Sequence, residues 1–248
     1  MNELDHLYFE YQHTIRSYDI GMDKKATVPA LIQIMHEAAM KHVLKLGLSA
    51  FELEKQHLAW VLIQQRFELI SAPLLGETIT IKTNPSGLER VITYRDFRLY
   101  NPSGELLAQA STSWLLMNTL TRKMARYPED ISNILLPTNG FEQLQRPERK
   151  LKTLETAEQS VSFPIRYYDL DFNGHLSNFY YMKWMLVSLG TSFLKEHQLI
   201  DFEIKIQGES IQGEVLEAEI QSISDTTFLH TLRKEDQIVA IGKTNWKK

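Results

Sequence analysis

The chain has no cysteine among its 248 residues, and only 11 glycines and 8 prolines. The lack of thiols excludes a disulfide framework, a thiolate metal site and a cysteine nucleophile, so any catalysis must use oxygen, carboxylate or imidazole groups. No apolar run approaches the roughly 20 residues of a membrane span, and the acidic first ten residues contain no apolar signal core. We therefore expect a cytoplasmic protein without a membrane span.

The charge balance is slightly acidic, with 27 Lys and Arg residues against 31 Asp and Glu residues and a formal net charge of −4. This balance disfavours nucleic acid as a partner. Hydrophobic residues make up 43% of the chain, which is ordinary for a globular protein and excludes a disordered one. The sequence predicts no metal site and no cofactor.

Three short motifs recur in the same order, which indicates an internal duplication. The pairs are RSYDI (16–20) with RYYDL (166–170), GETI (76–79) with GEVL (213–216), and AQASTSW (108–114) with AIGKTNW (240–246). The offset between the copies falls from 150 to 137 and then to 132 residues, so the first copy carries the longer loops.

Each copy has the pattern of an extended segment, one long helix and a set of strands. In the first copy Thr27 is placed to cap a helix with Pro29 in its first turn and Gly47 at its end. In the second copy the pattern predicts a helix over residues 178–195 that is apolar on nearly all sides and must be wrapped by other elements. A long helix wrapped by a curved antiparallel sheet is the hotdog arrangement. The sequence therefore predicts an α+β tandem double hotdog.

The predicted domains are an N-terminal hotdog over residues 1–125, a linker over 126–158 and a C-terminal hotdog over 159–248. The linker is polar and basic. We interpret its cations, Arg146 among them, as solvated charge.

A set of polar side chains is present only in the second copy. At matched positions Asp171, Asn173, His175 and Asn178 replace Gly21, Asp23, Lys25 and Val28, and Glu209 and Ser210 replace Ala72 and Pro73. One catalytic copy and one structural copy would show this difference. The loop over 171–178 precedes a helix, where free N–H groups and the helix dipole can stabilise a developing oxyanion.

These residues also suit a purely structural role. Asp, Asn and Gly before a helix are ordinary capping residues, and we interpret Asn178 as a cap or loop-bonding residue rather than a catalyst. A single His175 is commonly structural. Glu209 lies in a stretch, 202–211, that is predicted to be a strand, where an exposed Glu is unremarkable.

The loop over 171–178, followed by Tyr181 and Trp184, resembles the Asp-x-Asn-x-His-x-x-Asn signature of the acyl-acyl carrier protein (acyl-ACP) thioesterases, tandem hotdog enzymes of plants and bacteria. The segment 208–210 resembles the stretch of that family that carries a Glu-Cys pair. The resemblance covers nearly the whole chain. It implies hydrolysis of a fatty acyl thioester on ACP, with a catalytic set of Asp171, Asn173, His175 and Glu209, and with Ser210 and Asn178 as supporting residues.

Ser210 stands where plant members have Cys, and a serine nucleophile would need a base to activate its hydroxyl. We expect instead that Glu209 or Asp171 activates water, while Asn173 and His175 orient the water or the carbonyl. The resemblance further implies that the acyl chain lies mostly in the N-terminal copy and that ACP, through its phosphopantetheine arm, is the partner. Because ACP is acidic, a basic docking patch is expected, for which the candidates are Lys24, Lys25, Arg122, Lys123 and Arg126.

Two other functions remain open from the sequence. One is a hotdog thioesterase that acts on acyl-CoA, with a hotdog dehydratase as a variant. The other is a non-catalytic acyl-binding double hotdog, which the retention of the polar set in the second copy disfavours. The duplicated layout is compatible with a monomer and with a further homodimer.

Overall fold

The computed structural model describes residues 7–135 and 142–248. The start of the predicted N-terminal domain, residues 1–6, and the middle of the predicted linker, residues 136–141, lie outside the described residues. In the part of the chain that is described, no helix is both long enough and apolar enough to cross a membrane.

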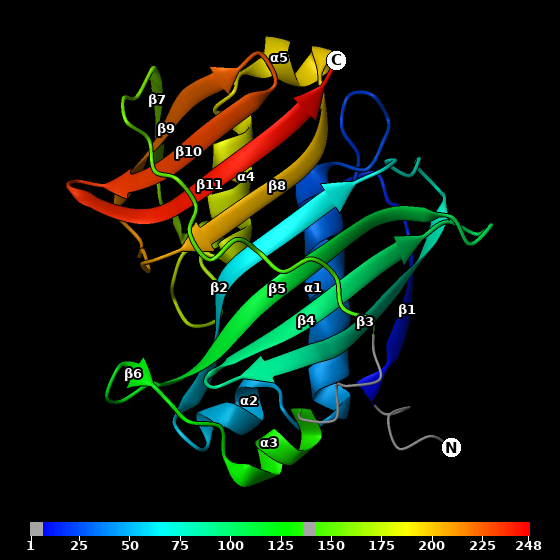
Figure 1. Cartoon of the computed structure of the whole chain (residues 1–248), viewed down its shortest axis with the longest axis vertical. Coiled ribbons are helices and arrows are strands. Elements are labelled where there is room, and N and C mark those ends of the chain that lie inside the picture. The colour runs from blue at the N-terminus through cyan, green and yellow to red at the C-terminus, as the bar shows by residue number, and fades with distance from the viewer. Residues whose placement is uncertain (1–6, 136–141) are drawn as a thin grey trace. The chain divides into compact units, whose positions relative to one another are not determined.

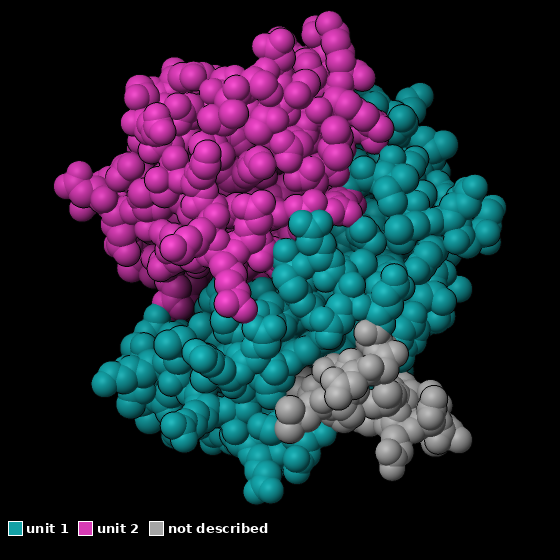
Figure 2. All heavy atoms as spheres, in the orientation of Figure 1, with its two compact units in different colours: residues 1–63, 69–146 teal, residues 64–68, 147–248 magenta. Residues whose placement is uncertain are grey.

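The chain divides into two compact units, which Figure 2 shows in two colours. The first unit comprises residues 1–63 and 69–146, and the second comprises residues 64–68 and 147–248. Each unit consists of helix and antiparallel sheet.

In the first unit, helix α1 lies along one face of the sheet (Figure 1). The helices are α1 (Val28–Lys45), α2 (Ala50–Glu54) and α3 (Glu129–Leu135). The strands are β1 (Phe9–Thr14), β2 (Leu58–Leu69), β3 (Thr78–Glu89), β4 (Ile92–Tyr100), β5 (Leu106–Asn118) and β6 (Lys123–Met124). Strands β1, β3, β4 and β5 are neighbours in that order, and β6 pairs with β5.

Helix α1 begins and ends where the sequence predicts. The Thr27 hydroxyl accepts a hydrogen bond from the Ala30 amide at 3.3 Å. At the other end Gly47 has φ 69°, which lets the Leu48 amide reach back to the Val43 carbonyl at 2.8 Å. The local signals therefore sufficed for this element.

The second unit repeats the plan. Its helices are α4 (Asn178–Val187) and α5 (Thr191–Glu196), with a 3₁₀ turn, η2 (Tyr167–Asp169). The strands are β7 (Gln159–Pro164), β8 (Gln198–Ile206), β9 (Val215–Ser224), β10 (Thr227–Lys234) and β11 (Gln237–Lys247). Their order is β8-β11-β10-β9-β7, and residues 64–68 of β2 pair with β8.

The prediction of one continuous helix over residues 178–195 is wrong, because the helix breaks after α4. The Ser188 hydroxyl donates to the Met185 carbonyl at 2.8 Å, and Gly190 adopts φ 88° before α5 begins. Residues on α4 such as Met185 are buried, as expected, but Val187 is 39% exposed. The helix is therefore wrapped on most sides but not on all.

Part of the predicted linker belongs to the folded first unit. Helix α3 buries Ile131 in an apolar cluster, whose other buried members are Leu48, Leu53, Leu58 and Leu116. This cluster ties the segment after β6 to the end of α1 and to α2.

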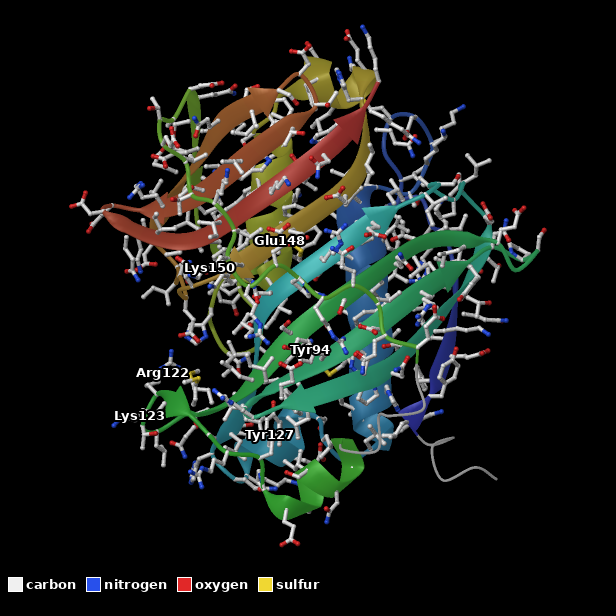
Figure 3. The ribbon with its side chains drawn as sticks, in the orientation of Figure 1. Tyr94, Arg122, Lys123, Tyr127, Glu148 and Lys150 are labelled. Atoms are coloured by element: carbon white, nitrogen blue, oxygen red, sulfur yellow. The ribbon has the colours of Figure 1, made fainter. Side chains whose placement is uncertain are left out.

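Arg146 is also part of the first unit, so its interpretation as solvated charge is wrong. Its guanidinium donates to the Asp96 carboxylate at 3.0 Å and to the Ser86 hydroxyl at 2.7 Å. It also lies 4.3 Å from the ring centroid of Tyr94, which Figure 3 labels. Because Asp96 is completely buried, its charge requires this partner.

The loops that precede α1 and α4 share one backbone frame. Ile20 pairs with Ala26 as Leu170 pairs with Leu176, at an offset of 150 in both positions. The loop of the first unit then pairs with Leu74 and the loop of the second with Ile211, at the offset of 137. The alignment of the two copies is thus confirmed at the segments that carry the polar set.

Candidate active site

The loop between β7 and α4 is folded around Asp171. The Asp171 carboxylate accepts hydrogen bonds from the amides of Asn173 at 2.8 Å and His175 at 3.2 Å. The Asp171 amide donates to the His175 carbonyl at 2.8 Å, and Gly174 supplies φ 76° for the tight turn. One carboxylate oxygen of Asp171 therefore holds the loop in shape.

Glu209 reaches this loop from the segment that follows β8. The strand ends at Ile206, so the prediction that Glu209 lies within a strand is wrong. The Leu176 amide donates to the Ser210 carbonyl at 2.7 Å, and His175 forms a β-bridge with Ile211. The main chain thus brings the two segments together.

The side chains of His175 and Glu209 form a pair. The His175 Nε2 atom lies 3.4 Å from a Glu209 carboxylate oxygen. The bridge between His175 and Ile211 brings the imidazole within reach of Glu209, which lies two residues before Ile211. The two side chains are 28% and 35% exposed, so the pair is open to water and to a ligand.

The two asparagines of the motif lie at different places: Asn173 is in the turn of the loop, and Asn178 is at the start of α4. Asn173 is exposed beside the turn. Asn178 is the first residue of α4, and the capping position belongs to Ser177, so the interpretation of Asn178 as the helix cap is wrong. The Ser177 side chain makes no capping hydrogen bond, whereas Thr27 at the matched position caps α1. The first turn of α4 therefore has no side-chain cap.

Two buried hydroxyl groups lie behind the Glu209 segment. Ser210 is completely buried, and its hydroxyl makes no hydrogen bond of normal geometry within the described residues. Tyr181, on α4, is 2% exposed and donates its hydroxyl to the Gly208 carbonyl at 3.2 Å. Burial raises the pKa of Tyr181 to about 12, with the adjacent Ser210 hydroxyl acting to lower it and the negative charge of Glu209 acting to raise it. From the sequence Tyr181 was only part of a motif, with no predicted role.

The five cations predicted to bind a partner protein are all exposed and lie in the first unit. Lys24 and Lys25 are on the loop before α1. Arg122 and Lys123 project from the turn at β6 (Figure 3), and Arg126 follows shortly after. Their docking role stays a prediction. Within the described ranges, no three His, Asp or Glu side chains are arranged to hold a metal ion.

Family models match both units. The model described as the acyl-ACP thioesterase N-terminal domain matches residues 6–135, and the one described as the C-terminal domain matches residues 152–248. The chain belongs to the acyl-ACP thioesterase family. The resemblance inferred from the loop and from the segment around Glu209 is thereby confirmed.

Curated relatives of this family are similar over almost the whole chain. A chloroplastic palmitoyl-ACP thioesterase of Arabidopsis thaliana is 28% identical over 269 residues, which cover 98% of this chain and 64% of the relative. A chloroplastic oleoyl-ACP thioesterase of the same plant is 28% identical over 279 residues, covering 98% and 77%. The chain thus spans just under two thirds of the length of the first relative.

Solved structures share the fold. An acyl-ACP thioesterase from Bacteroides thetaiotaomicron superposes with a TM-score of 0.85 at 21% identity, covering all of both chains. The 12:0-ACP thioesterase from Umbellularia californica gives a TM-score of 0.83 at 22% identity, covering 97% of each chain. The predicted tandem double hotdog is confirmed.

Proposed function

We propose that this chain hydrolyses fatty acyl thioesters of ACP to free fatty acid and ACP. The observation that carries the proposal is the accessible His175–Glu209 pair, which lies on the loop frame where the two copies differ. Membership of the acyl-ACP thioesterase family and the names of the relatives support the choice of substrate.

In this mechanism Glu209 is the general base. Its carboxylate faces His175, whereas one oxygen of Asp171 is taken up by two backbone N–H groups. Glu209 takes a proton from water as the water oxygen adds to the thioester carbonyl carbon. When the carbon–sulfur bond breaks, the leaving thiolate takes that proton, and the fatty acid releases its own proton to solvent. A positioned base of this kind contributes about 10²–10⁴-fold to the rate.

The carbonyl oxygen of the substrate is placed at the first turn of α4. This turn lies directly after the loop that carries His175, and its N–H groups have no side-chain cap. Such groups, together with the positive end of the helix dipole, stabilise the charge that develops on the oxygen. Asn173 lies at the loop tip, where its amide can orient water or the thioester.

Ser210 is not the nucleophile in this mechanism. Its side chain is completely buried, and the imidazole of His175 is paired with the Glu209 carboxylate. A serine nucleophile needs a base within hydrogen-bond distance.

ACP is the proposed partner, docked through Lys24, Lys25, Arg122, Lys123 and Arg126. The support is their exposure and the attraction between basic side chains and an acidic carrier. A cytoplasmic location remains a prediction, since both plant relatives are described as chloroplastic.

The test measures thiol release from palmitoyl-ACP and oleoyl-ACP and, in parallel, from the same acyl groups on CoA. We expect faster release from the ACP substrates at equal concentration, because the carrier adds docking contacts. Equal or faster release from CoA would favour a general acyl-CoA thioesterase. No release from any substrate would leave a non-catalytic acyl-binding protein as the better description.

A further inference from the structure

The difference between the two copies extends from the loop into the helix beneath it. Tyr181 occupies the position of Leu31 in the first copy, at the same offset of 150 that relates the two loops. Both side chains are buried. The second copy therefore has a buried hydroxyl as well as its polar set, and the first copy has neither at the matched positions.

We infer that Tyr181 is a positioning residue that sets the place of Glu209 against His175. The inference rests on the proposed role of Glu209 as the base. The Tyr181 hydroxyl donates to the carbonyl of Gly208, the residue directly before Glu209.

Gly208 is held between two elements, through its amide on one side and its carbonyl on the other. On one side the amides of Gln207 and Gly208 both donate to the Val239 carbonyl on β11, at 2.8 and 3.1 Å. A Cβ atom at Gly208 would come within 3.3 Å of the Val239 side chain, so the backbone lies close against β11. On the other side is the Tyr181 hydroxyl. The peptide that leads into Glu209 is thus fixed by β11 and α4 together.

The first copy shows that the hydroxyl is not needed to build the segment. There the amides of Ile70 and Ser71 both donate to the Leu107 carbonyl, at 2.9 and 3.0 Å, as Gln207 and Gly208 do to Val239. The same backbone forms in the copy that has Leu31, without a hydroxyl, at the position of Tyr181 and Ala72, without a carboxylate, at the position of Glu209. What Tyr181 adds therefore concerns the side chain that only the second copy has, Glu209.

The experiment is a double-mutant cycle with Tyr181→Phe and Glu209→Gln, assayed with palmitoyl-ACP. Tyr181→Phe keeps the ring and removes the hydroxyl, and we expect kcat to fall about 10-fold with KM within about twofold of wild type. In the Glu209→Gln background the same substitution has no further effect, because its target carboxylate is gone. Melting temperatures check that each variant folds.

The control is Tyr127→Phe, which removes the buried hydroxyl of a partly buried tyrosine in the first unit, with no loss of kcat expected. An undiminished kcat in Tyr181→Phe overturns the inference, and so does an equal further loss in the Glu209→Gln background, which would indicate general loosening of the unit.

A readout independent of activity separates this inference from the proposed function. In NMR spectra at fixed pH, the His175 ring-proton shifts of Tyr181→Phe should move in the direction seen in Glu209→Gln. Unmoved His175 shifts in Tyr181→Phe overturn the inference even when the wild-type protein hydrolyses no thioester. An inactive wild-type protein whose His175 shifts do move refutes the proposed function alone.

Discussion

At the scale of single residues, the two carboxylates of the site are held in different ways. Asp171 is bound to the amides of its own loop, whereas Glu209 faces the imidazole of His175 from a separate segment. Accepting two N–H hydrogen bonds and taking a proton from water are different tasks for a carboxylate. The geometry therefore separates a loop-holding carboxylate from a reacting one.

Conservative amide substitutions test this separation. Glu209→Gln should lower kcat by at least about 10²-fold, because an amide cannot take the proton from water. Asp171→Asn should keep most of the activity, since the amide oxygen still accepts both N–H bonds, and Asp171→Ala should lose activity together with the loop. Steady-state kinetics with palmitoyl-ACP and thermal melts measure both. If Asp171→Asn is as inactive as Glu209→Gln, the charge of Asp171 is needed and the separation of roles is refuted. An inactive Asp171→Asn beside an active Glu209→Gln would make Asp171 the base.

The sequence predicted which residues gather at the site but not how they are held. The loop of Asp171 and His175 is local, so its motif is visible in the sequence. The contact with Glu209 joins residues 34 positions apart (209 − 175) through a β-bridge, and it could be expected only from a family resemblance. The Tyr181 hydroxyl can be recognised from the sequence only when the helices of the two copies are aligned, since Leu31 occupies the same position in the first copy.

At the scale of elements, the loops before α1 and α4 form the same turn with different residues at the left-handed position. Lys24 has φ 63° where the second unit has Gly174 with φ 76°. A side chain in this left-handed region costs about 1 kcal/mol or more, while glycine adopts the region freely.

The matched pair predicts different effects on stability. Gly174→Ala should lower the free energy of unfolding by about 1 kcal/mol. Lys24→Gly should not lower it, because the strain that it relieves offsets the greater freedom of glycine in the unfolded chain. Urea denaturation of the two variants beside wild type measures both. A marked loss of stability in Lys24→Gly would show that the Lys24 side chain stabilises the loop.

Elements were predictable where their signals are local. The ends of α1 depend on Thr27 and Gly47, which act within one turn of the helix. The break between α4 and α5 was missed because a helical pattern tolerates a single glycine, and only the fold decides that Gly190 turns the chain. Arg146 was misread because its partner Asp96 is distant in the sequence.

At the scale of the whole chain, one buried histidine links stability to pH. His230 is completely buried on β10, its Nε2 atom bonds to the Thr244 hydroxyl at 2.9 Å, and burial lowers its pKa to about 3. The unfolded chain binds this proton below about pH 6.5, and the folded chain does not until about pH 3. The folded state therefore loses stability as the pH falls from 6.5 towards 3, by up to about 1.4 kcal/mol per pH unit.

His230→Phe should flatten this dependence. Phe97 faces Ala110 in the first unit as His230 faces Gly242 in the second, so an aromatic ring without a titrating group suits the position. Between pH 6.5 and pH 5 the wild-type protein should lose about 2 kcal/mol more than the variant. Urea denaturation at both pH values measures the slope, which is independent of any constant cost of the substitution. Equal slopes would exclude His230 as the source.

The duplication was the part of the architecture most visible in the sequence, because it leaves repeated motifs at steady offsets. Nothing in the sequence indicated that β2 is divided between the two units. Its residues 64–68 group with the second unit through their pairing with β8, which joins segments about 140 residues apart. Such pairing depends on tertiary contacts that no local pattern records.

The shared loop frame also has a consequence for evolvability. Its bonds run between main-chain groups, from the amide of Ala26 to the carbonyl of Pro73 and from the amide of Leu176 to the carbonyl of Ser210. Side chains that take no part in holding the loop can be exchanged without changing these bonds, whereas Asp171 in the second unit and Asp23 in the first accept loop amides. The combination Lys25→His and Ala72→Glu would therefore place an imidazole and a carboxylate at the positions of the first unit that match His175 and Glu209, so that a second reaction centre could evolve there from few substitutions.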